Sequence, residues 1–341
     1  MKRIGYLDAL RVISMMAVML LHQAATGQQL ADPISREWAI CWVYNLLSRF
    51  SVPAFVMISG ALFLAPERDV TTRSLYLHRI PRLIGIFLVW SFAYATAESA
   101  LSEPLFSAEF FLAVLRRTVS GHYHMWFLYL IMGLYLATPL LRKIAASTRS
   151  LGIFVLLCTL LGGAVRGLSL LNPENPFWNF LKQADPGLFM GYCGYYCLGS
   201  LLFRKEIPAK GKILLPLSAL LAMSAAAAIG WHRINLRGIL LDEGMPHVAF
   251  YATCVFYLFR KNAAFFEKNC KVRRILQTFA PCTLGMYLIH PAVNFLLRRA
   301  GIHGLTCDPL WWLIPCTGLV WIVSFWCIAA ARKLHILKKF T

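Results

Sequence analysis

Apolar stretches of about 20 residues recur along the whole chain, and short polar segments separate them. A helix of about 20 residues crosses the roughly 30 Å hydrocarbon core of a bilayer. Glycine and proline within some stretches are compatible with such helices, because neighbouring helices can satisfy the freed backbone groups. The pattern predicts an all-α polytopic membrane protein, a single membrane-embedded domain over residues 1–341, with ten spans: 7–26, 38–64, 82–101, 124–141, 151–171, 187–203, 212–231, 245–260, 275–297 and 309–331.

The composition supports a membrane location. Hydrophobic residues make up 59% of the chain and charged residues 14%, and the mean hydropathy is +0.61. A soluble domain carries roughly a quarter charged residues. The segments between the apolar stretches are short, so they leave no soluble domain of useful size.

The distribution of positive charge predicts the orientation. Ten spans place both termini on one side, and the segments predicted for that side contain 23 of the 34 Lys and Arg residues. Because cytoplasmic loops carry the excess of positive charge, we expect both termini in the cytoplasm. The net charge of +19 is thus spread over short loops. We expect no nucleic-acid partner, since no soluble module is present to dock one.

The first apolar stretch contains the most informative polar residues. Arg11 and His22 share one face of a helix and lie roughly 16 Å apart along it. An ionisable side chain within a bilayer is costly and marks a functional interior by default. Asp8 precedes Arg11 by one turn, and we expect the two to pair. These residues also favour a retained helix over a cleaved signal peptide.

Further polar groups occur in the second and third stretches. Arg49 is followed by Pro53, which interrupts helical hydrogen bonding, and by the small pair Ser59 and Gly60. Arg79 and Arg82 are three residues apart and share a face if that segment is helical. Two such guanidinium groups suit a phosphate-rich ligand, but positive-inside anchoring explains them equally well.

Histidines and aromatic residues mark the opposite side. His122, His124 and Trp126 open the fourth span, and the ninth places Tyr287 and His290 directly before Pro291. An interfacial Trp or Tyr is expected in any membrane protein, and a lone buried histidine is more often structural. However, His22, His124 and His290 occur on three spans in the same half of the membrane, which favours a shared site.

The sequence predicts no metal site. The ten cysteines are scattered, and most of them fall inside apolar stretches, where cysteine behaves as a small hydrophobic residue. Cys193 and Cys197 are one helical turn apart but lack the further Cys or His ligands of a zinc site.

These motifs together resemble the acyltransferase-3 family of integral membrane acyltransferases. Each short motif is weak alone, but they occur in the family's order and cover essentially the whole chain. Within the family, the chain is particularly similar to bacterial members that O-acetylate surface polysaccharides, among them enterobacterial common antigen O-acetyltransferases. The resemblance rests on Asp8, Arg11 and His22 (D-x2-R-x10-H), Phe55 to Gly60, Arg79 and Arg82 (R-x2-R), His124 to Leu128, and Tyr287 to Pro291.

The resemblance implies transfer of an acyl group from cytoplasmic acyl-CoA to a hydroxyl of a surface glycan or its lipid-linked precursor, at the bacterial inner membrane. Acetyl-CoA is the expected co-substrate, and no tightly bound cofactor is expected. His22 is then either the general base for the hydroxyl or itself the acylated intermediate. The resemblance also implies that the donor is bound by Arg79, Arg82, Arg11 and Gly60, and that Asp8 acts as the partner of Arg11. Ser59 would line the donor channel or stabilise an oxyanion. The acceptor side would be formed by His124, Trp126, Tyr287 and His290.

Two other functions fit many spans with buried polar residues: a transporter or flippase for a lipid-linked saccharide, and a catalytically silent relative. The R-x2-R pair, the single deep histidine His22 and the lack of a visible internal repeat favour the acyltransferase over the transporter. The complete set of motifs argues against the silent relative.

Overall fold

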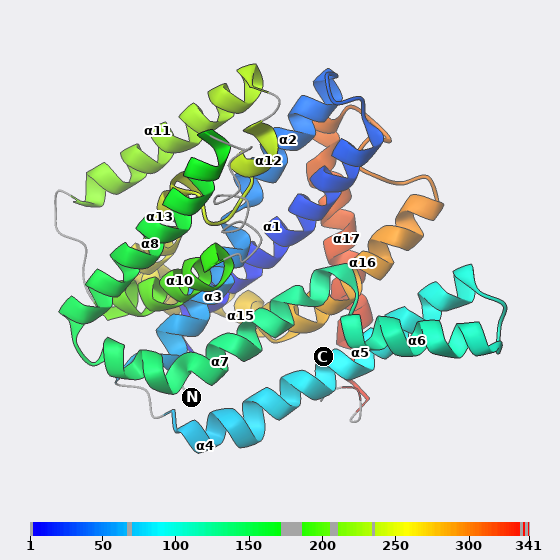
Figure 1. Ribbon diagram of the computed structural model, residues 1–341, viewed down its shortest axis with the longest axis horizontal. Helices are drawn as coiled ribbons and strands as arrows, with labels where there is room; N and C mark the ends of the chain where they lie inside the picture. Colours follow the sequence, from blue (N-terminus) through cyan, green and yellow to red (C-terminus); the bar gives the residue numbers. More distant parts are fainter. Residues whose placement is uncertain are drawn as a thin grey trace.

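The computed structural model describes residues 3–66, 70–171, 186–204, 211–233, 236–334, 337 and 340, with the backbone alone for 164–171 and 186–190. Regular structure within this part is entirely helical (Figure 1). Its elements are α1 Gly5–Leu30, α2 Arg36–Ser48, α3 Ser51–Phe63, α4 Thr72–Ser74, η1 Leu75–Arg79, α5 Ile80–Ser102, α6 Ala108–Ser120, η2 Tyr123–Met125, α7 Trp126–Ala145, α8 Thr148–Leu171, α10 Pro186–Arg204, α11 Gly211–His232, α12 Arg237–Leu240, α13 Pro246–Lys261, α14 Ala263–Lys268, α15 Cys270–Phe279, η4 Ala280–Cys282, α16 Thr283–Arg299 and α17 Pro309–Ala331.

The predicted all-α membrane architecture is confirmed. Every predicted span coincides with one helix or with two helices joined end to end. Seven helical segments of the described chain are long and apolar enough to cross a membrane, and α8, α10 and α13 coincide with the other three predicted spans. The number of crossings and the cytoplasmic location of the termini stay predictions.

The second and ninth predicted spans are each broken by a proline. Pro53 lacks the N–H that would bond to the carbonyl of Arg49, and its ring crowds that carbonyl. Accordingly α2 ends at Ser48 and α3 begins at Ser51. In the ninth span, α15 and α16 are separated by the short 3₁₀ turn η4, which contains Pro281.

The two ends of the chain meet near this turn. Arg3, just before α1, lines a small pocket together with Pro281, and Arg332, which follows α17, donates a hydrogen bond to the Pro281 carbonyl at 3.1 Å. The start of α1 and the end of α17 therefore lie at the same end of the molecule.

Helix α1 is the central element of the bundle. It packs against α2, α3, α13, α16 and α17 (Figure 1). Its buried side chains face these neighbours around most of its circumference, and they include Asp8, Ser14 and Gln23. Because Asp8, Ser14 and Gln23 are buried against these neighbours, they are shielded from lipid.

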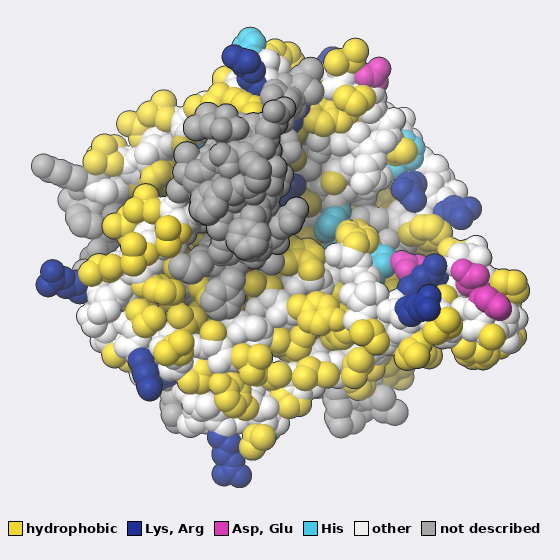
Figure 2. Space-filling model, in the orientation of Figure 1, with side chains coloured by type: hydrophobic (Ala, Val, Ile, Leu, Met, Phe, Trp, Pro, Cys, Tyr) yellow, Lys and Arg dark blue, Asp and Glu magenta, His cyan; other side chains and the backbone are white. Residues whose placement is uncertain are grey.

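The outward faces of the surrounding helices are apolar. Exposed side chains include Phe92 on α5, Leu140 on α7, Leu220 on α11 and Trp326 on α17. Figure 2 shows hydrophobic side chains over much of the visible surface, with Lys and Arg mainly at its margins. This surface is typical of a protein that contacts lipid.

Candidate functional site

Three cavities follow one another along α1. The basal pocket, about 160 Å³, lies at the start of α1 and extends from Arg3 to Arg11. The central cavity, about 300 Å³, extends from Arg11 to His22. The distal chamber, about 440 Å³, extends from His22 to Gln29. Arg11 lines the first two cavities and His22 lines the last two, so these side chains stand at the two boundaries.

The expected pairing of Asp8 with Arg11 is present. The guanidinium NH1 of Arg11 donates to Asp8 Oδ1 at 2.8 Å, and both side chains are largely buried. A buried ion pair costs desolvation energy, and the mutual attraction of its partners offsets part of that cost. The pair holds a cationic group between the basal pocket and the central cavity.

The three histidines predicted to share a site do converge. The ring of His290 lies 5.1 Å from that of His22 and 5.6 Å from that of His124, measured between centroids. They come from α1, η2 and α16. His22 and His124 both line the central cavity, while His290 is fully buried behind them.

Proline 291 determines the orientation of His290. Because a proline has no N–H, Pro291 leaves the Tyr287 carbonyl without its helical partner. His290 Nδ1 takes that place and donates to the Tyr287 carbonyl at 2.7 Å. A neutral His290 therefore carries no proton on Nε2, which is buried and has no hydrogen-bond partner among the described residues.

Tyr287 and Trp126 line the central cavity and not the distal chamber. The Tyr287 hydroxyl donates to the backbone carbonyl of His124, which ties α16 to η2. The Trp126 ring packs 5.8 Å from that of Tyr192 and is 40% exposed. Of the four expected acceptor-side residues, Trp126, His124 and Tyr287 thus line the central cavity, His290 lines none of the three cavities, and none of the four lines the distal chamber.

Ser59 and Gly60 serve different purposes. Ser59 lines the central cavity, as expected for a residue of the donor channel. Gly60 lines none of the three cavities, and a Cβ there would overlap the backbone oxygen of Tyr196 on α10. Gly199 of α10 meets the backbone of Met57 in the same way. Helix packing between α3 and α10 accounts for Gly60 without a donor role.

Arg79 and Arg82 do not line any of the three cavities. Arg79 ends the π-helical turn η1, and its guanidinium lies over the Phe63 ring, 4.7 Å from the centroid. Arg82 is exposed in the first turn of α5. Arg79 is thus half-buried and Arg82 is exposed. The role of both residues in donor binding stays a prediction.

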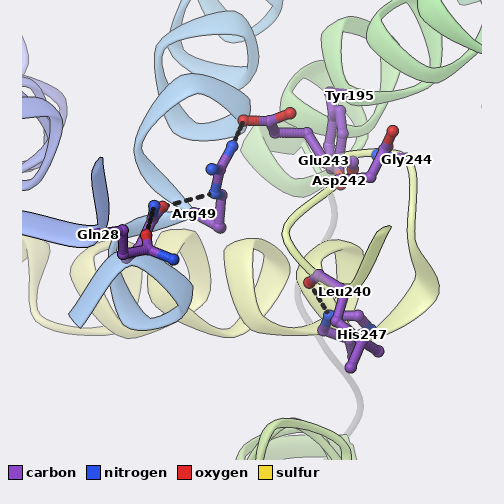
Figure 3. A network of polar contacts seen from close by, with 9 residues as sticks. Gln28, Arg49, Tyr195, Leu240, Asp242, Glu243, Gly244 and His247 are labelled. Carbon is purple, nitrogen blue, oxygen red and sulfur yellow. Dashed lines mark hydrogen bonds and ion pairs between the residues drawn. The ribbon is translucent and has the colours of Figure 1, made fainter. Parts of the chain in front are cut away.

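An ion pair at the central cavity was not found from the sequence. Arg49 NH1 lies 2.8 Å from Glu243 Oε1, and both residues line the cavity. Arg49 Nε donates to Asn45 at 3.0 Å, and Asn45 donates to Gln28 of α1 at 2.7 Å (Figure 3). Glu243 lies in the loop after α12, 194 residues from Arg49 in the sequence, so no short sequence motif indicates the contact.

The distal chamber is polar and was also missed. Gln23 donates to Asn294 across the chamber wall at 2.8 Å, joining α1 to α16. No Asp or Glu occurs among the residues described as its lining. The polar residues that line it are His22, Gln23, Thr26, Gln29, His122, Tyr123, Asn294, Arg298 and His303.

Comparison with protein families supplies the identification. The family model of the acyltransferase domain, the acyltransferase-3 family, matches residues 4–330, from the start of α1 to the last residues of α17. The chain belongs to this family. Comparison with curated proteins and with solved structures gave no match. The protein is therefore a membrane acyltransferase, and its cavities are to be understood in terms of acyl transfer.

Proposed function

We propose that this acyltransferase moves an acyl group, in the first instance acetyl, from cytoplasmic acyl-CoA to a hydroxyl of a surface glycan or its lipid-linked precursor. The supporting observation is the succession of cavities along α1, with His22 at the boundary between the central cavity and the distal chamber. A donor and an acceptor that enter from opposite ends would meet at this imidazole.

The donor end carries the positive charge. Arg3 and Arg11 line the basal pocket, and guanidinium groups bind phosphates through charge-assisted hydrogen bonds. The resemblance adds Arg79 and Arg82 as further ligands for the CoA phosphates. The central cavity is mostly apolar, which suits the pantetheine arm and a short acyl chain. Acyl-CoA is consumed as a co-substrate, so no bound cofactor is required.

Two routes at His22 balance chemically. In the first, the imidazole takes the proton of the acceptor hydroxyl while its oxygen bonds to the thioester carbon. The carbon–sulfur bond then breaks, and the thiolate leaves with that proton as the thiol. In the second, the imidazole nitrogen first displaces the thiol, and the hydroxyl then displaces the imidazole from the acyl group.

The acceptor end offers neutral hydrogen-bonding groups. Gln23, Gln29 and Asn294 present amides to the distal chamber, and such groups can both donate to and accept from sugar hydroxyls. The resemblance to bacterial surface-polysaccharide O-acetyltransferases, including the enterobacterial common antigen enzymes, agrees with this assignment and with an inner-membrane location.

The proposal is tested with purified protein in sealed vesicles. Acetyl-CoA carrying a labelled acetyl group is supplied on one face, and bacterial surface glycan or its lipid-linked precursor on the other. We expect label in the glycan as an alkali-labile ester. In parallel, mass spectrometry of surface glycans should show one acetyl mass per modified residue lost when the gene is deleted. Movement of unmodified lipid-linked saccharide without labelling would instead identify a transporter.

A further inference from the structure

We propose that Glu98 and His122 are positioning residues that hold His124 as a proton acceptor facing the central cavity. The proton that His124 accepts is passed to His122 at the wall of the distal chamber. This proposal rests on the proposed acyl transfer, and it adds two residues that neither the motifs nor the family assignment single out. It follows from two contacts, Glu98 to His122 and His122 to His124, and from the unpartnered nitrogen of His124 beyond them.

The first contact joins Glu98 to His122. Glu98 Oε1 lies 3.2 Å from His122 Nε2, and the Glu98 side chain is partly exposed in the last turns of α5. A carboxylate oxygen only accepts, so this contact favours a proton on His122 Nε2. The His122 ring is further held by stacking on Tyr94, with 4.2 Å between centroids.

The second contact joins the two imidazoles. His122 Nδ1 and His124 Nδ1 lie 2.7 Å apart, a distance that requires one proton between two nitrogens. A neutral His122 that carries its proton on Nε2 can only accept at Nδ1. His124 is then the donor. The opposite arrangement would turn the lone pair of His122 Nε2 toward the Glu98 carboxylate.

The remaining nitrogen of His124, Nε2, lies at the end of this hydrogen-bonded series, opposite to Glu98. Because His124 uses Nδ1–H for His122, its Nε2 carries a lone pair. That nitrogen is buried and has no hydrogen-bond partner among the described residues, while His124 lines the central cavity. The Leu288 carbonyl, which accepts the Tyr94 hydroxyl at 2.7 Å, faces the same ring but does not reach hydrogen-bond geometry with Nε2. An unpartnered imidazole nitrogen in a reaction cavity is suited to take a proton.

The sequence around His122 builds this geometry. Gly121 has a positive φ of 75°, and a Cβ there would come within 2.8 Å of the Phe87 ring. Only glycine fits this turn readily. It redirects the chain after α6 so that His122 faces the distal chamber and His124, two residues later, faces the central cavity.

The proton steps balance. The relay belongs to the second route, in which His22 carries the acyl group. As the acceptor oxygen displaces the His22 imidazole from the acyl carbon, its O–H proton bonds to His124 Nε2, and the Nδ1 proton of His124 passes to His122 Nδ1. His122 is then an imidazolium beside the Glu98 carboxylate. Acyl transfer to a hydroxyl takes up and releases no net proton. The thiol leaves in the earlier step with the proton that His22 loses on acylation. The same bonds therefore return the relayed proton to the displaced His22 imidazole.

The kinetic experiment compares Glu98→Gln with the matched control Glu103→Gln, at the end of the same helix. Glutamine can still accept from His122 but does not stabilise the imidazolium. We expect kcat to fall about tenfold and the donor KM to stay constant. The acid limb of the pH profile should move to lower pH, because the relay is then harder to protonate. A purely structural role would lower activity without moving that limb.

Other titratable or charged groups surround the relay and are unchanged in this variant. They are Tyr94 on α5, Tyr123 on η2, His22 on α1, and Tyr287, His290 and Arg298 on α16. His122→Phe keeps a ring against Tyr94 but removes both nitrogens. We expect this variant to lose about a hundredfold in kcat. Activity and pH profiles of Glu98→Gln equal to those of Glu103→Gln would overturn the proposal.

Nitrogen NMR of histidine-labelled protein in nanodiscs tests the relay without any turnover. We expect the proton of His124 on Nδ1 in the wild type, and a mixture of tautomers in His122→Phe. A wild-type His124 that carries its proton on Nε2 at neutral pH would disprove the relay. If the wild type transfers no acyl group, the proposed function fails, and the NMR result still decides the relay on its own.

Discussion

The two ends of α1 face chemically different surroundings. At its start, the basal pocket contains Arg3, Asp8 and Arg11, which are all charged. At its other end, most of the polar residues that line the distal chamber are amides and histidines, and Arg298 is its one Lys or Arg among the described lining residues. A single helix thus presents one end suited to a polyanion and another suited to hydroxyl groups. We therefore expect the two substrates of the proposed reaction to be recognised in different ways.

Replacement of His22 should have the largest effect, because this residue lines both the central cavity and the distal chamber. We expect His22→Ala to abolish acyl transfer while the protein accumulates normally. The space-filling variant His22→Leu should be equally inactive, since the role is chemical. Labelled acetyl transfer measures both. The control is His232→Ala, which changes an exposed histidine at the end of α11. Wild-type transfer by His22→Ala would remove this residue from the mechanism.

Arg11→Gln should weaken donor binding at the basal pocket. A charge-assisted hydrogen bond contributes about 1.5–3 kcal/mol, so we expect the donor KM to rise about tenfold or more with the acceptor KM unchanged. The variant also leaves the Asp8 carboxylate without its partner. The double variant Asp8→Asn/Arg11→Gln removes both charges and separates these two effects. An unchanged donor KM in both variants would place the phosphates elsewhere.

The double variant Arg79→Lys/Arg82→Lys tests the donor role implied by the R-x2-R motif. Lysine keeps the charge needed for insertion but lacks the planar fork that binds phosphate oxygens in pairs. We expect unchanged topology and about tenfold weaker acyl-CoA binding, measured by titration. Since only Arg79 is half-buried, the single change Arg79→Lys should account for most of the loss. Wild-type affinity would show that these arginines only anchor the helix.

Arg298→Gln should weaken acceptor binding at the distal chamber and leave donor binding unchanged. We expect the acceptor KM to rise by several fold and the donor KM to stay constant, because Arg298 lines only the distal chamber. Arg299→Gln is the matched control: Arg299 lies over the Phe295 ring, 5.2 Å from its centroid, and lines none of the three cavities. Equal effects of the two variants would argue for a general loss of positive charge.

A topology reporter decides which end faces the cytoplasm and should leave activity unchanged. We expect a reporter fused after residue 341 to be cytoplasmic and one inserted near Asn175 to lie outside; both positions fall outside the described residues. The expectation follows from the 23 basic residues of the predicted cytoplasmic segments. Because the start of α1 and the end of α17 lie at the same end of the molecule, an external C-terminus would reverse the assignment of the two ends.

The local pattern of the sequence predicted most of the helices. Apolar stretches of membrane length coincide with α1, α5, α8, α11 and α17 because lipid requires each spanning segment to satisfy its own backbone hydrogen bonds. The break before Pro53 was also foreseeable, since its cause is the missing N–H. The role expected for Gly60 was not supported, because a close helix contact and a ligand contact both require a small residue.

The sequence alone determined that Arg11 and His22 share one face of a helix and that Asp8 pairs with Arg11, because helical periodicity fixes neighbours three and four residues apart. Only the tertiary structure decided that Glu98 reaches His122, that Glu243 reaches Arg49, and that Gln23 reaches Asn294. These partners come from helices and loops far apart in the chain. These contacts depend on how whole helices pack, and the residue spacing within one segment does not determine that packing.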